Sequence, residues 1–344
     1  MPDVSTRSRS VEDAEAVRAP IRDEMGRQLL LELYRRMLLI RRFEEKAVGA
    51  YRQKKIAGFF HPYIGTEPVA TGFMCHLGDE DYTTTSYRCH AQGLLLGLPP
   101  RSLMAELFGK VTGNVRGKGG SMHFFSKERK FLGGHGIVGG QLPVGAGAAF
   151  ACKYRKTGGI SLTFMGDGAT VQGTLHESLN LCSLWDLPAL YVIENNEWGM
   201  GTAVHRAVSV DRIAEAKAPG YDIVGHTVDG TDLYATWQLG RDIISGMRDD
   251  NRPVLVEAKG VRFMGHSVSD AQAYRTREAI KQMRESRDGL VRVAGDLVEA
   301  DWASAEELEE IDAEIKATVA DAIAYADASP EPPMSELQRH VFAQ

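Results

Sequence analysis

The sequence has few cysteines, no excess of positive charge and no long apolar run, and each lack excludes a class of protein. The four cysteines lie far apart and form no CxxC pair, which argues against zinc sites and a disulfide framework. The formal net charge is −6 at pH 7, so no electrostatic signal for nucleic-acid binding stands out. No apolar run could cross a bilayer, and the polar, acidic start does not resemble a secretory signal. We therefore expect a cytoplasmic protein with neither a nucleic-acid nor a membrane partner.

The composition is that of a globular protein large enough to bury a core. Hydrophobic residues make up 43% and charged residues 25% of the 344 residues. Residues 1–27 are polar and are expected to form an N-terminal tail. Residues 28–330 are expected to form one α/β domain, which becomes helical and highly charged from residue 276 onward. Prolines then end the last expected helix, so residues 331–344 are expected to form a C-terminal tail.

A β-α-β unit near the middle of the chain is the clearest structural signal. Residues 160–165 and 189–193 are short runs rich in apolar residues, which predicts two buried strands. Residues 171–185 between them predict a helix. The first strand leads into Gly-Asp-Gly and the second into Glu-Asn-Asn. Because open α/β sheets bind ligands at the carboxyl ends of their strands, we expect Asp167 and Asn196 to converge.

These two side chains predict a metal site that holds a diphosphate. An Asp carboxylate, an Asn carbonyl and one backbone carbonyl form a hard oxygen set, which suits magnesium completed by waters and phosphate oxygens. The backbone amides of Gly168 and Ala169 open the following helix and can receive the same phosphates. The alternative is a pair of ordinary turns without a ligand, but both motifs lie at strand ends, which favours the site.

Two further chemical groups follow predicted strands. Runs with strand character also occur at residues 82–86, 221–228 and 253–258. Arg88 comes just after the first of them, and its planar fork matches the geometry of a phosphate. His266 lies in the polar segment 260–274 after the last of them, which we expect to be a mobile loop at the edge of the active site.

Glycine is unusually dense between residues 113 and 147. Core elements avoid glycine, so this density predicts that backbone passes close to something bulky. Residues 134–139 literally match the dinucleotide pattern GxGxxG. However, no strand is predicted before them, and no acidic residue follows about 20 positions later to hold a ribose. A nicotinamide-dependent oxidoreductase is therefore a weak alternative.

The chain resembles the alpha subunits of the first component of 2-oxo acid dehydrogenase complexes, which depend on thiamine diphosphate. The resemblance runs from about residue 28 to the end, and each motif gains its specificity from the others. The resemblance implies the thiamine-diphosphate-binding α/β fold: a mostly parallel sheet flanked by helices, with helical N- and C-terminal extensions. The motifs are GFFHPYIGTE, SYRCH, GKGGSMHFF, GGHGIVGGQLPVGAG, MGDGATVQG, IENNEWGMGT, MGHSVSD and YRTREAI.

The resemblance also implies a role for individual residues of this chain. Magnesium would be bound by Asp167, Asn196 and the carbonyl of Trp198. Catalytic roles would fall to His266, Arg88 and His61. The substrate pocket of pyruvate-type members would be narrowed here by Phe59, Tyr87 and Gln172. The cofactor would be bound by Tyr87, Arg88, Gly136, Val138, Asp167, Gly168, Ala169, Asn196 and His266, with Gly136 and Val138 offering backbone hydrogen bonds to the aminopyrimidine.

The expected activity is the oxidative decarboxylation of a small 2-oxo acid, pyruvate being favoured by Gln172, with transfer of the acetyl group to a lipoyl group. Activation of the cofactor needs a carboxylate on its pyrimidine ring, and no glutamate of this chain lies in a fitting context. The resemblance therefore implies a beta subunit in an α2β2 assembly, and the lipoyl domain of a dihydrolipoyl acyltransferase as acceptor. The alternatives are a branched-chain 2-oxo acid or acetoin dehydrogenase subunit, and a noncatalytic subunit that keeps the fold.

Overall fold

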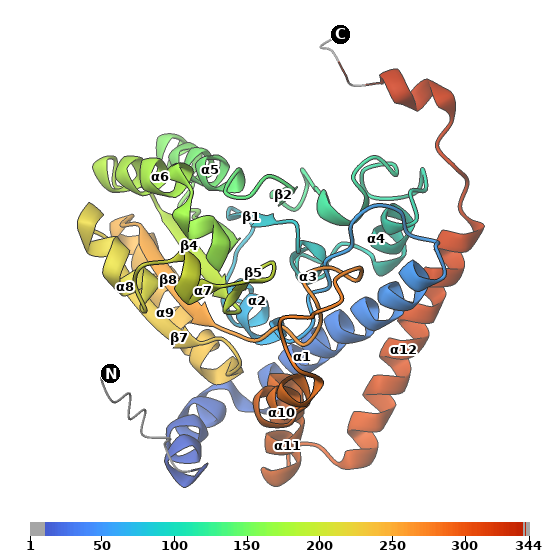
Figure 1. Cartoon of the computed structure of the whole chain (residues 1–344). Coiled ribbons are helices and arrows are strands. Elements are labelled where there is room, and N and C mark those ends of the chain that lie inside the picture. Colours follow the sequence, from blue (N-terminus) through green and yellow to red (C-terminus); the bar gives the residue numbers. More distant parts are fainter. Residues whose placement is uncertain (1–10, 340, 342–344) are drawn as a thin grey trace.

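A six-stranded parallel sheet forms the centre of the molecule (Figure 1). The computed structural model describes residues 11–339 and 341. The strand order is β2-β1-β3-β4-β8-β7, and every neighbouring pair is parallel. This confirms the expected α/β class with a mostly parallel sheet. The strands are β1 (Tyr82–Ser86), β2 (Phe131–His135), β3 (Ser161–Gly166), β4 (Ala189–Asn195), β7 (Val224–Asp229) and β8 (Val254–Lys259).

Five of these strands lie where runs with strand character predict them, whereas β2 was not predicted. Its sequence, Phe-Leu-Gly-Gly-His, contains two glycines and no β-branched residue, so it carries no strand signal. It nevertheless pairs with β1 as the edge strand of the sheet. A short antiparallel hairpin, β5 (Trp198–Gly199) with β6 (Thr202–Ala203), follows β4.

Side chains on alternate positions of the strands bury against helices on both faces of the sheet. Leu190 and Val192 of β4 belong to the largest apolar cluster, whereas Tyr191 and Ile193 belong to a second cluster on the opposite face. Central strands buried on both faces are typical of parallel sheets and explain the continuous apolar runs in the sequence.

Two groups of helices form the outer layers (Figure 1). The second cluster is covered by α5 (Gln141–Arg155), α6 (Gly173–Leu184) and α8 (Ile213–Lys217). The largest cluster is covered by α1 (Val11–Arg52), α2 (Glu67–Met74), α4 (Pro100–Leu107), α9 (Leu233–Asp250) and α12 (Ala305–Ala328). The remaining helices are α3 (His90–Leu95), α7 (Val204–Ala207), α10 (Arg277–Arg287) and α11 (Gly289–Glu299), with 3-10 turns η1 (Gly120–Met122), η2 (Asp167–Val171), η3 (Ala218–Tyr221) and η4 (Met334–Gln338).

The first helix begins earlier than the polar sequence suggests. We expected a tail over residues 1–27, but α1 starts at Val11, and the side chains of Ile21 and Met25 are buried in a third apolar cluster with α9, α11 and α12. Gly26 marks a kink inside this helix, with φ at 70°. Residues 1–10 lie outside the described part of the chain. In that described part, no helix is both long and apolar enough to span a bilayer.

Candidate active site

The carboxyl ends of the central strands open into one cleft. β1 delivers Tyr87 and Arg88 to it, β3 delivers Asp167, and β4 delivers Asn196. Val138, an apolar and partly exposed residue, lies at the outer edge of the cleft. Its lining comprises Pro62, Ile64, Thr66, Ser86, Tyr87, Arg88, Val138, Gly139, Gln141, Gly166, Asp167, Gly168, Ala169, Glu194, Asn196, Trp198, Gly199, Met200, Arg262 and His266.

The two strand-end residues that the sequence singled out lie together. Asp167 is 2% exposed, and the backbone amide of Asn196 donates a hydrogen bond to it. Its Oδ2 atom is buried and has no hydrogen-bond partner. Burial raises the pKa of Asp167 to about 6. A buried carboxylate oxygen without a partner is costly in a folded protein, so this atom is placed to accept a cation.

Arg88 is a buried cation without a carboxylate partner among its hydrogen bonds. It is 8% exposed, and its guanidinium donates to the carbonyls of Pro62 at 3.0 Å and His266 at 2.7 Å. Burial lowers the pKa of this guanidinium. Buried charges are normally paired, and the fork of an arginine matches a phosphate, so Arg88 is placed to receive an anion.

Arg262 is a second buried guanidinium in the cleft, and the sequence reasoning missed it. It is 3% exposed. One nitrogen, Nη1, lies 3.4 Å from Asn196 Oδ1 and 3.3 Å from the carbonyl oxygen of Trp198. These are two of the three expected magnesium ligands, so the structure brings both to one point. Arg262 follows β8 by only three residues, and that position at a strand end was the signal that could have found it.

Two histidines meet beside these cations. The ring of His61 lies 5.0 Å from that of His266 and 4.4 Å from that of Tyr87. His266 Nδ1 lies 3.4 Å from Arg88 Nη2 and 3.5 Å from Arg262 Nη1. Guanidinium nitrogens only donate, so Nδ1 accepts and the proton of neutral His266 resides on Nε2. Burial, with Arg88 as the next cause, lowers the pKa of His61 to about 2 and that of His266 to about 3.

The segment that carries His266 is tied down by its own side chains. Asp270 Oδ2 accepts hydrogen bonds from the amide of His266 at 2.7 Å and from the hydroxyl of Tyr274 at 2.6 Å. Arg262 donates to the same hydroxyl at 2.6 Å. The sequence predicts a mobile loop here. In the structure this network connects the loop to the cleft, and it would have to break for the loop to open.

The lowered pKa of His61 predicts a specific loss of stability in acid. The unfolded chain protonates its histidines near pH 6.5, whereas folded His61 stays neutral, so the unfolded state binds more protons below that pH. Stability should therefore fall as the pH drops from 7 to 5, by at most about 1.4 kcal/mol per pH unit for this residue. His61→Gln should flatten the decline of the melting temperature, whereas His205→Gln, at an exposed position on α7, should not. Equal slopes for all three proteins would contradict the prediction.

The remaining predicted residues form the outer part of the site. Val138 lines the cleft and is 45% exposed. Gly136 lies just before it, against the ring of His123, and Gln172 packs beside Gly139. Phe59 is 64% exposed and lies next to His61, with ring centroids 6.4 Å apart. These groups thus extend from the cleft to the molecular surface.

Glu194 is a second lining residue that the sequence reasoning did not select. It is the last but one residue of β4, is 5% exposed, and its carboxyl accepts a hydrogen bond from the hydroxyl of buried Tyr63. Burial raises the pKa of Glu194 to about 7. Its position in a strand-end motif was visible in the sequence, but its partner lies 131 positions away and was not.

The charges of the cleft fit a diphosphate held with a divalent cation. Two guanidiniums there bond mainly to carbonyl oxygens, and Asp167 has an unpartnered oxygen. A diphosphate would neutralise Arg88 and Arg262. A divalent cation would bind the free oxygen of Asp167 together with Asn196 Oδ1 and the carbonyl of Trp198. The arrangement can therefore anchor the diphosphate of a larger molecule inside the protein, with the rest of that molecule toward Val138 at the outer edge of the cleft.

Comparison with known proteins gives consistent results. Residues 35–335 match the family model described as "Dehydrogenase E1 component". The chain is 43% identical to "Pyruvate dehydrogenase E1 component subunit alpha" of Rhizobium meliloti, over 93% of this chain and 91% of the relative. The protein of the same name from Zymomonas mobilis is also 43% identical, over 94% of this chain and 91% of the relative. "Pyruvate dehydrogenase E1 component subunit alpha, somatic form, mitochondrial" of Homo sapiens is 40% identical, over 94% of this chain and 82% of the relative.

Proposed function

This chain belongs to the dehydrogenase E1 component family, and we propose on that premise that it is the alpha subunit of a pyruvate dehydrogenase. Within an assembled first component it would decarboxylate pyruvate oxidatively and pass the acetyl group to a lipoyl group. The observation that carries the proposal is the cleft, where the unpartnered oxygen of Asp167 faces the same space as two buried guanidiniums.

The family depends on thiamine diphosphate, and we propose that magnesium joins it to this chain. When bound, thiamine diphosphate supplies the nucleophilic carbon that attacks the oxo group and the electron sink that accepts the electrons left by carbon dioxide. The metal would be held by Asp167, Asn196 and the carbonyl of Trp198. Arg88 would neutralise the phosphate charge, and Arg262 is placed to share that role, because both are buried and free of carboxylate partners in their hydrogen bonds.

His266 is placed to handle a proton beside the diphosphate. Its proton resides on Nε2 while Nδ1 faces the two guanidiniums, and its pKa, lowered to about 3, keeps the ring neutral at pH 7. A neutral imidazole can donate this proton and accept one in return. His61, in contact with it, is neutral for the same reason, so the pair presents two uncharged imidazoles to a substrate.

Pyruvate selectivity is assigned to the outer residues of the site. Phe59, Tyr87 and Gln172 would limit the space beside the reacting carbon, so that larger 2-oxo acids fit poorly. One methylene of misfit changes the transition-state free energy by only about 1–3 kcal/mol. Shape alone therefore gives a moderate preference rather than an absolute one.

Shortening Phe59 should weaken this preference. We expect Phe59→Ala in the assembled component to reduce the ratio of kcat/KM for pyruvate over 3-methyl-2-oxobutanoate by on the order of 10-fold, because the larger side chain gains room. Tyr325→Ala, which removes a partly exposed aromatic ring from α12, should leave the ratio unchanged. Steady-state assays with both acids measure the ratio. An unchanged ratio for Phe59→Ala would place substrate selection elsewhere.

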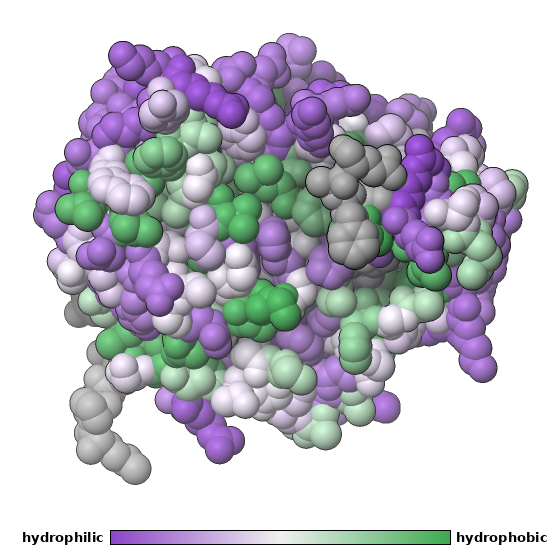
Figure 2. Space-filling model, turned by 90° about the horizontal axis from the view of Figure 1, so that it is seen from above, coloured by the Kyte–Doolittle hydropathy of each residue, from purple (hydrophilic) through white to green (hydrophobic). Residues whose placement is uncertain are grey.

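The second subunit would supply the carboxylate that activates the pyrimidine ring, which this chain lacks near Val138. The carboxylates that line the cleft in the described residues are Asp167, directly after β3, and Glu194, near the end of β4. Exposed apolar side chains also lie on α5 and α6, on the side of the molecule seen from above in Figure 2. Tyr154 is 79% exposed there and Leu184 69%. Apolar surfaces of this kind mark protein interfaces, so we assign this face to the beta subunit in an α2β2 assembly.

Reconstitution tests the function as a whole. The purified chain, combined with a beta-type subunit and a lipoyl domain, should release carbon dioxide from pyruvate and acetylate the lipoyl group. A preference for 3-methyl-2-oxobutanoate or acetoin in the same assay would move the chain to those relatives. Assembly with cofactor binding but no turnover of any of the three would indicate a noncatalytic subunit.

A further inference from the structure

The first half of the glycine-rich region wraps around a carboxylate of the protein itself. Glu106, on α4, is fully buried. One carboxylate oxygen, Oε2, accepts hydrogen bonds from the amides of Val115 at 3.0 Å and Gly117 at 2.8 Å. The other, Oε1, accepts from the amides of Gly119 at 2.8 Å and Gly120 at 3.1 Å. Four converging backbone amides form a nest of the kind that binds anions, and here the anion is built in.

The glycines in this loop are required by the wrapping. Gly117 has φ at +76°, and a Cβ there would lie 2.3 Å from the carbonyl oxygen of Gly109. A Cβ on Gly119 would lie 2.3 Å from the carbonyl oxygen of His123. The sequence correctly indicates that backbone passes close to something bulky. In residues 113–120 that neighbour is the protein's own backbone and Glu106, not a ligand.

The segment that follows the loop supports the edge strand β2. Ser126 and Phe131 exchange two backbone hydrogen bonds, at 3.0 and 2.8 Å. The amide of Gly134 donates to the carbonyl of Phe124 at 3.2 Å, and His123 Nδ1 lies 3.0 Å from the carbonyl oxygen of Gly134. β2 ends at His135, so residues 121–126 hold the backbone that leads directly into residues 136–138.

A second buried network fixes the start of this segment. His90 Nε2 lies 2.9 Å from both the hydroxyl and the carbonyl oxygen of Ser121. His90 Nδ1 lies 2.9 Å from the carboxylate of Glu44 on α1, and all three residues are buried. These contacts fix the segment of residues 121–126 at Ser121. The hydrogen bonds of Glu106 fix the backbone of residues 115–120, which leads into Ser121.

We propose that Glu106 is a positioning residue for the ring end of the cofactor site. Its carboxylate shapes the loop over residues 113–120, which places residues 121–126 against β2 and so sets the backbone of Gly136 and Val138. The inference rests on the proposed function for the identity of the ligand. The described hydrogen bonds of Glu106 lead to this loop and none to Arg88, Arg262 or Asp167 at the diphosphate end. Glu106 therefore acts on one end of the site only.

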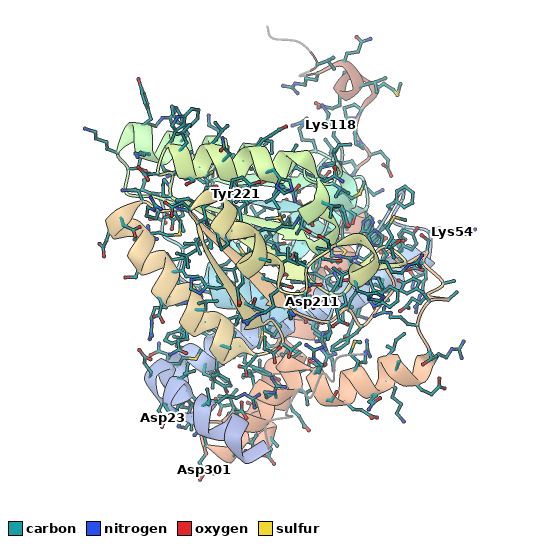
Figure 3. The ribbon with its side chains drawn as sticks, turned by 60° about the vertical axis from the view of Figure 1, so that its left-hand side comes forward. Asp23, Lys54, Lys118, Asp211, Tyr221 and Asp301 are labelled. Atoms are coloured by element: carbon teal, nitrogen blue, oxygen red, sulfur yellow. The ribbon has the colours of Figure 1, made fainter. Side chains whose placement is uncertain are left out.

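The outer side of the same loop is held differently. Arg116 and Lys118 form ion pairs with Glu336 of η4, at 2.6 and 3.2 Å, and Figure 3 shows Lys118 beside this C-terminal segment. The side chains of Arg116 and Lys118 are 46% and 38% exposed. These ion pairs hold the outer side of the loop to η4, and they leave the four amide contacts to Glu106 as its inner support.

The test separates the two ends of the site by comparing two ligands. In the assembled first component, Glu106→Gln places an amide donor against backbone amides that also donate, which opens the nest. We expect affinity for thiamine diphosphate with magnesium to fall at least tenfold, and affinity for inorganic diphosphate with magnesium to change less than twofold. Quenching of tryptophan fluorescence, with Trp198 in the cleft, measures both.

Asp81→Asn is the matched control. Asp81 is 5% exposed, and its carboxylate also accepts hydrogen bonds from two backbone amides, those of Gly78 at 2.7 Å and Ile160 at 2.8 Å. It directly precedes β1, however, so it lies at the amino ends of the strands, whereas the cleft lies at their carboxyl ends. This variant should lower stability without changing the ratio of the two affinities. A merely structural role for Glu106 would make both variants behave alike, and an unchanged or equally weakened pair of affinities in Glu106→Gln would overturn the proposal.

A second variant and a second readout keep the test decisive if Glu106→Gln folds poorly. Gly120→Ala leaves Glu106 intact but places a side chain at φ +59°, where no neighbour lies within 4 Å, so it should give a smaller shift in the same ratio.

Amide hydrogen exchange in the chain alone should quicken over residues 134–138 in each loop variant and stay unchanged in Asp81→Asn. Unaltered exchange there would overturn the proposal. Wild-type protein that binds inorganic diphosphate but not thiamine diphosphate would instead contradict the proposed function.

Discussion

Replacing Asp167 by alanine is expected to abolish the stabilisation that thiamine diphosphate and magnesium give to the assembled protein. A ligand at 100 times its Kd stabilises the folded state by about 2.7 kcal/mol, which appears as a rise in melting temperature. Among the described residues that line the cleft, Asp167 offers the one fully buried carboxylate oxygen without a hydrogen-bond partner, so without it the metal loses its charged ligand. The rise should disappear, and so should turnover.

The same position predicts an opposite effect when no cofactor is present. Burial raises the pKa of Asp167 to about 6, so above that pH the folded protein carries a charged group that it disfavours. From a reference near 3.8, this corresponds to a cost on the order of 3 kcal/mol at pH 7. Asp167→Asn removes the charge and keeps the shape. It should therefore melt at a higher temperature than the wild type without cofactor, and gain nothing when cofactor is added.

Asp211→Ala serves as the control, because Asp211 is exposed and its side chain lies outside the cleft lining. Its melting temperature should respond to cofactor as that of the wild type does. A normal cofactor-dependent rise in Asp167→Ala would reject the ligand role of Asp167, and with it the metal site that we propose.

The chain without a second subunit is expected to show no decarboxylation of pyruvate, even with thiamine diphosphate and magnesium at saturation. The reason is the distribution of acids in the cleft. Its lining carboxylates in the described residues are Asp167, directly after β3, and Glu194, near the end of β4, whereas residues 136–141 around Val138 contain no carboxylate. A pyrimidine placed there meets no carboxylate of this chain that could activate it.

Release of labelled carbon dioxide measures this directly. Addition of a beta-type subunit should raise the rate from the detection limit to that of the complete component. Tyr154→Asp, in the exposed apolar face on α5, should block this gain by preventing assembly, whereas Val291→Asp, at an exposed position on α11, should not. Turnover by the isolated chain would contradict the shared site.

The β-α-β unit and the chemistry at its strand ends could be predicted because the responsible signals are local. A run of apolar residues followed by Gly-Asp-Gly carries both the buried strand and the turn that ends it. Adjacent parallel strands place their carboxyl ends at one edge, so Asp167 and Asn196 had to lie close together. Tertiary structure added Arg262 and Glu194, whose roles depend on partners far away in the sequence, such as Trp198 and Tyr63.

The glycine-rich region shows where local signals fail. β2 pairs with β1 although its glycines disfavour a strand, because residues 121–126 and β1 flank it on both sides. The start of α1 was likewise hidden, since its early turns are polar apart from the few side chains that α9 and α11 cover. In both cases some of the stabilising contacts come from residues more than 30 positions away: β1 for β2, and α9, α11 and α12 for the start of α1.

By itself, the sequence determined the class of fold, the order of most strands and helices along the chain, and the strand-end residues that we propose to bind a metal and a diphosphate. Each of these depends on neighbours in the chain or on the general rule that parallel strands end at one edge. Only the tertiary structure decided that the two guanidiniums of the cleft have no carboxylate among their hydrogen-bond partners, that Asp167 keeps one buried oxygen free, and that the loop of residues 113–120 encloses Glu106. These features depend on burial and on contacts between distant segments, and neither is fixed until the chain has packed.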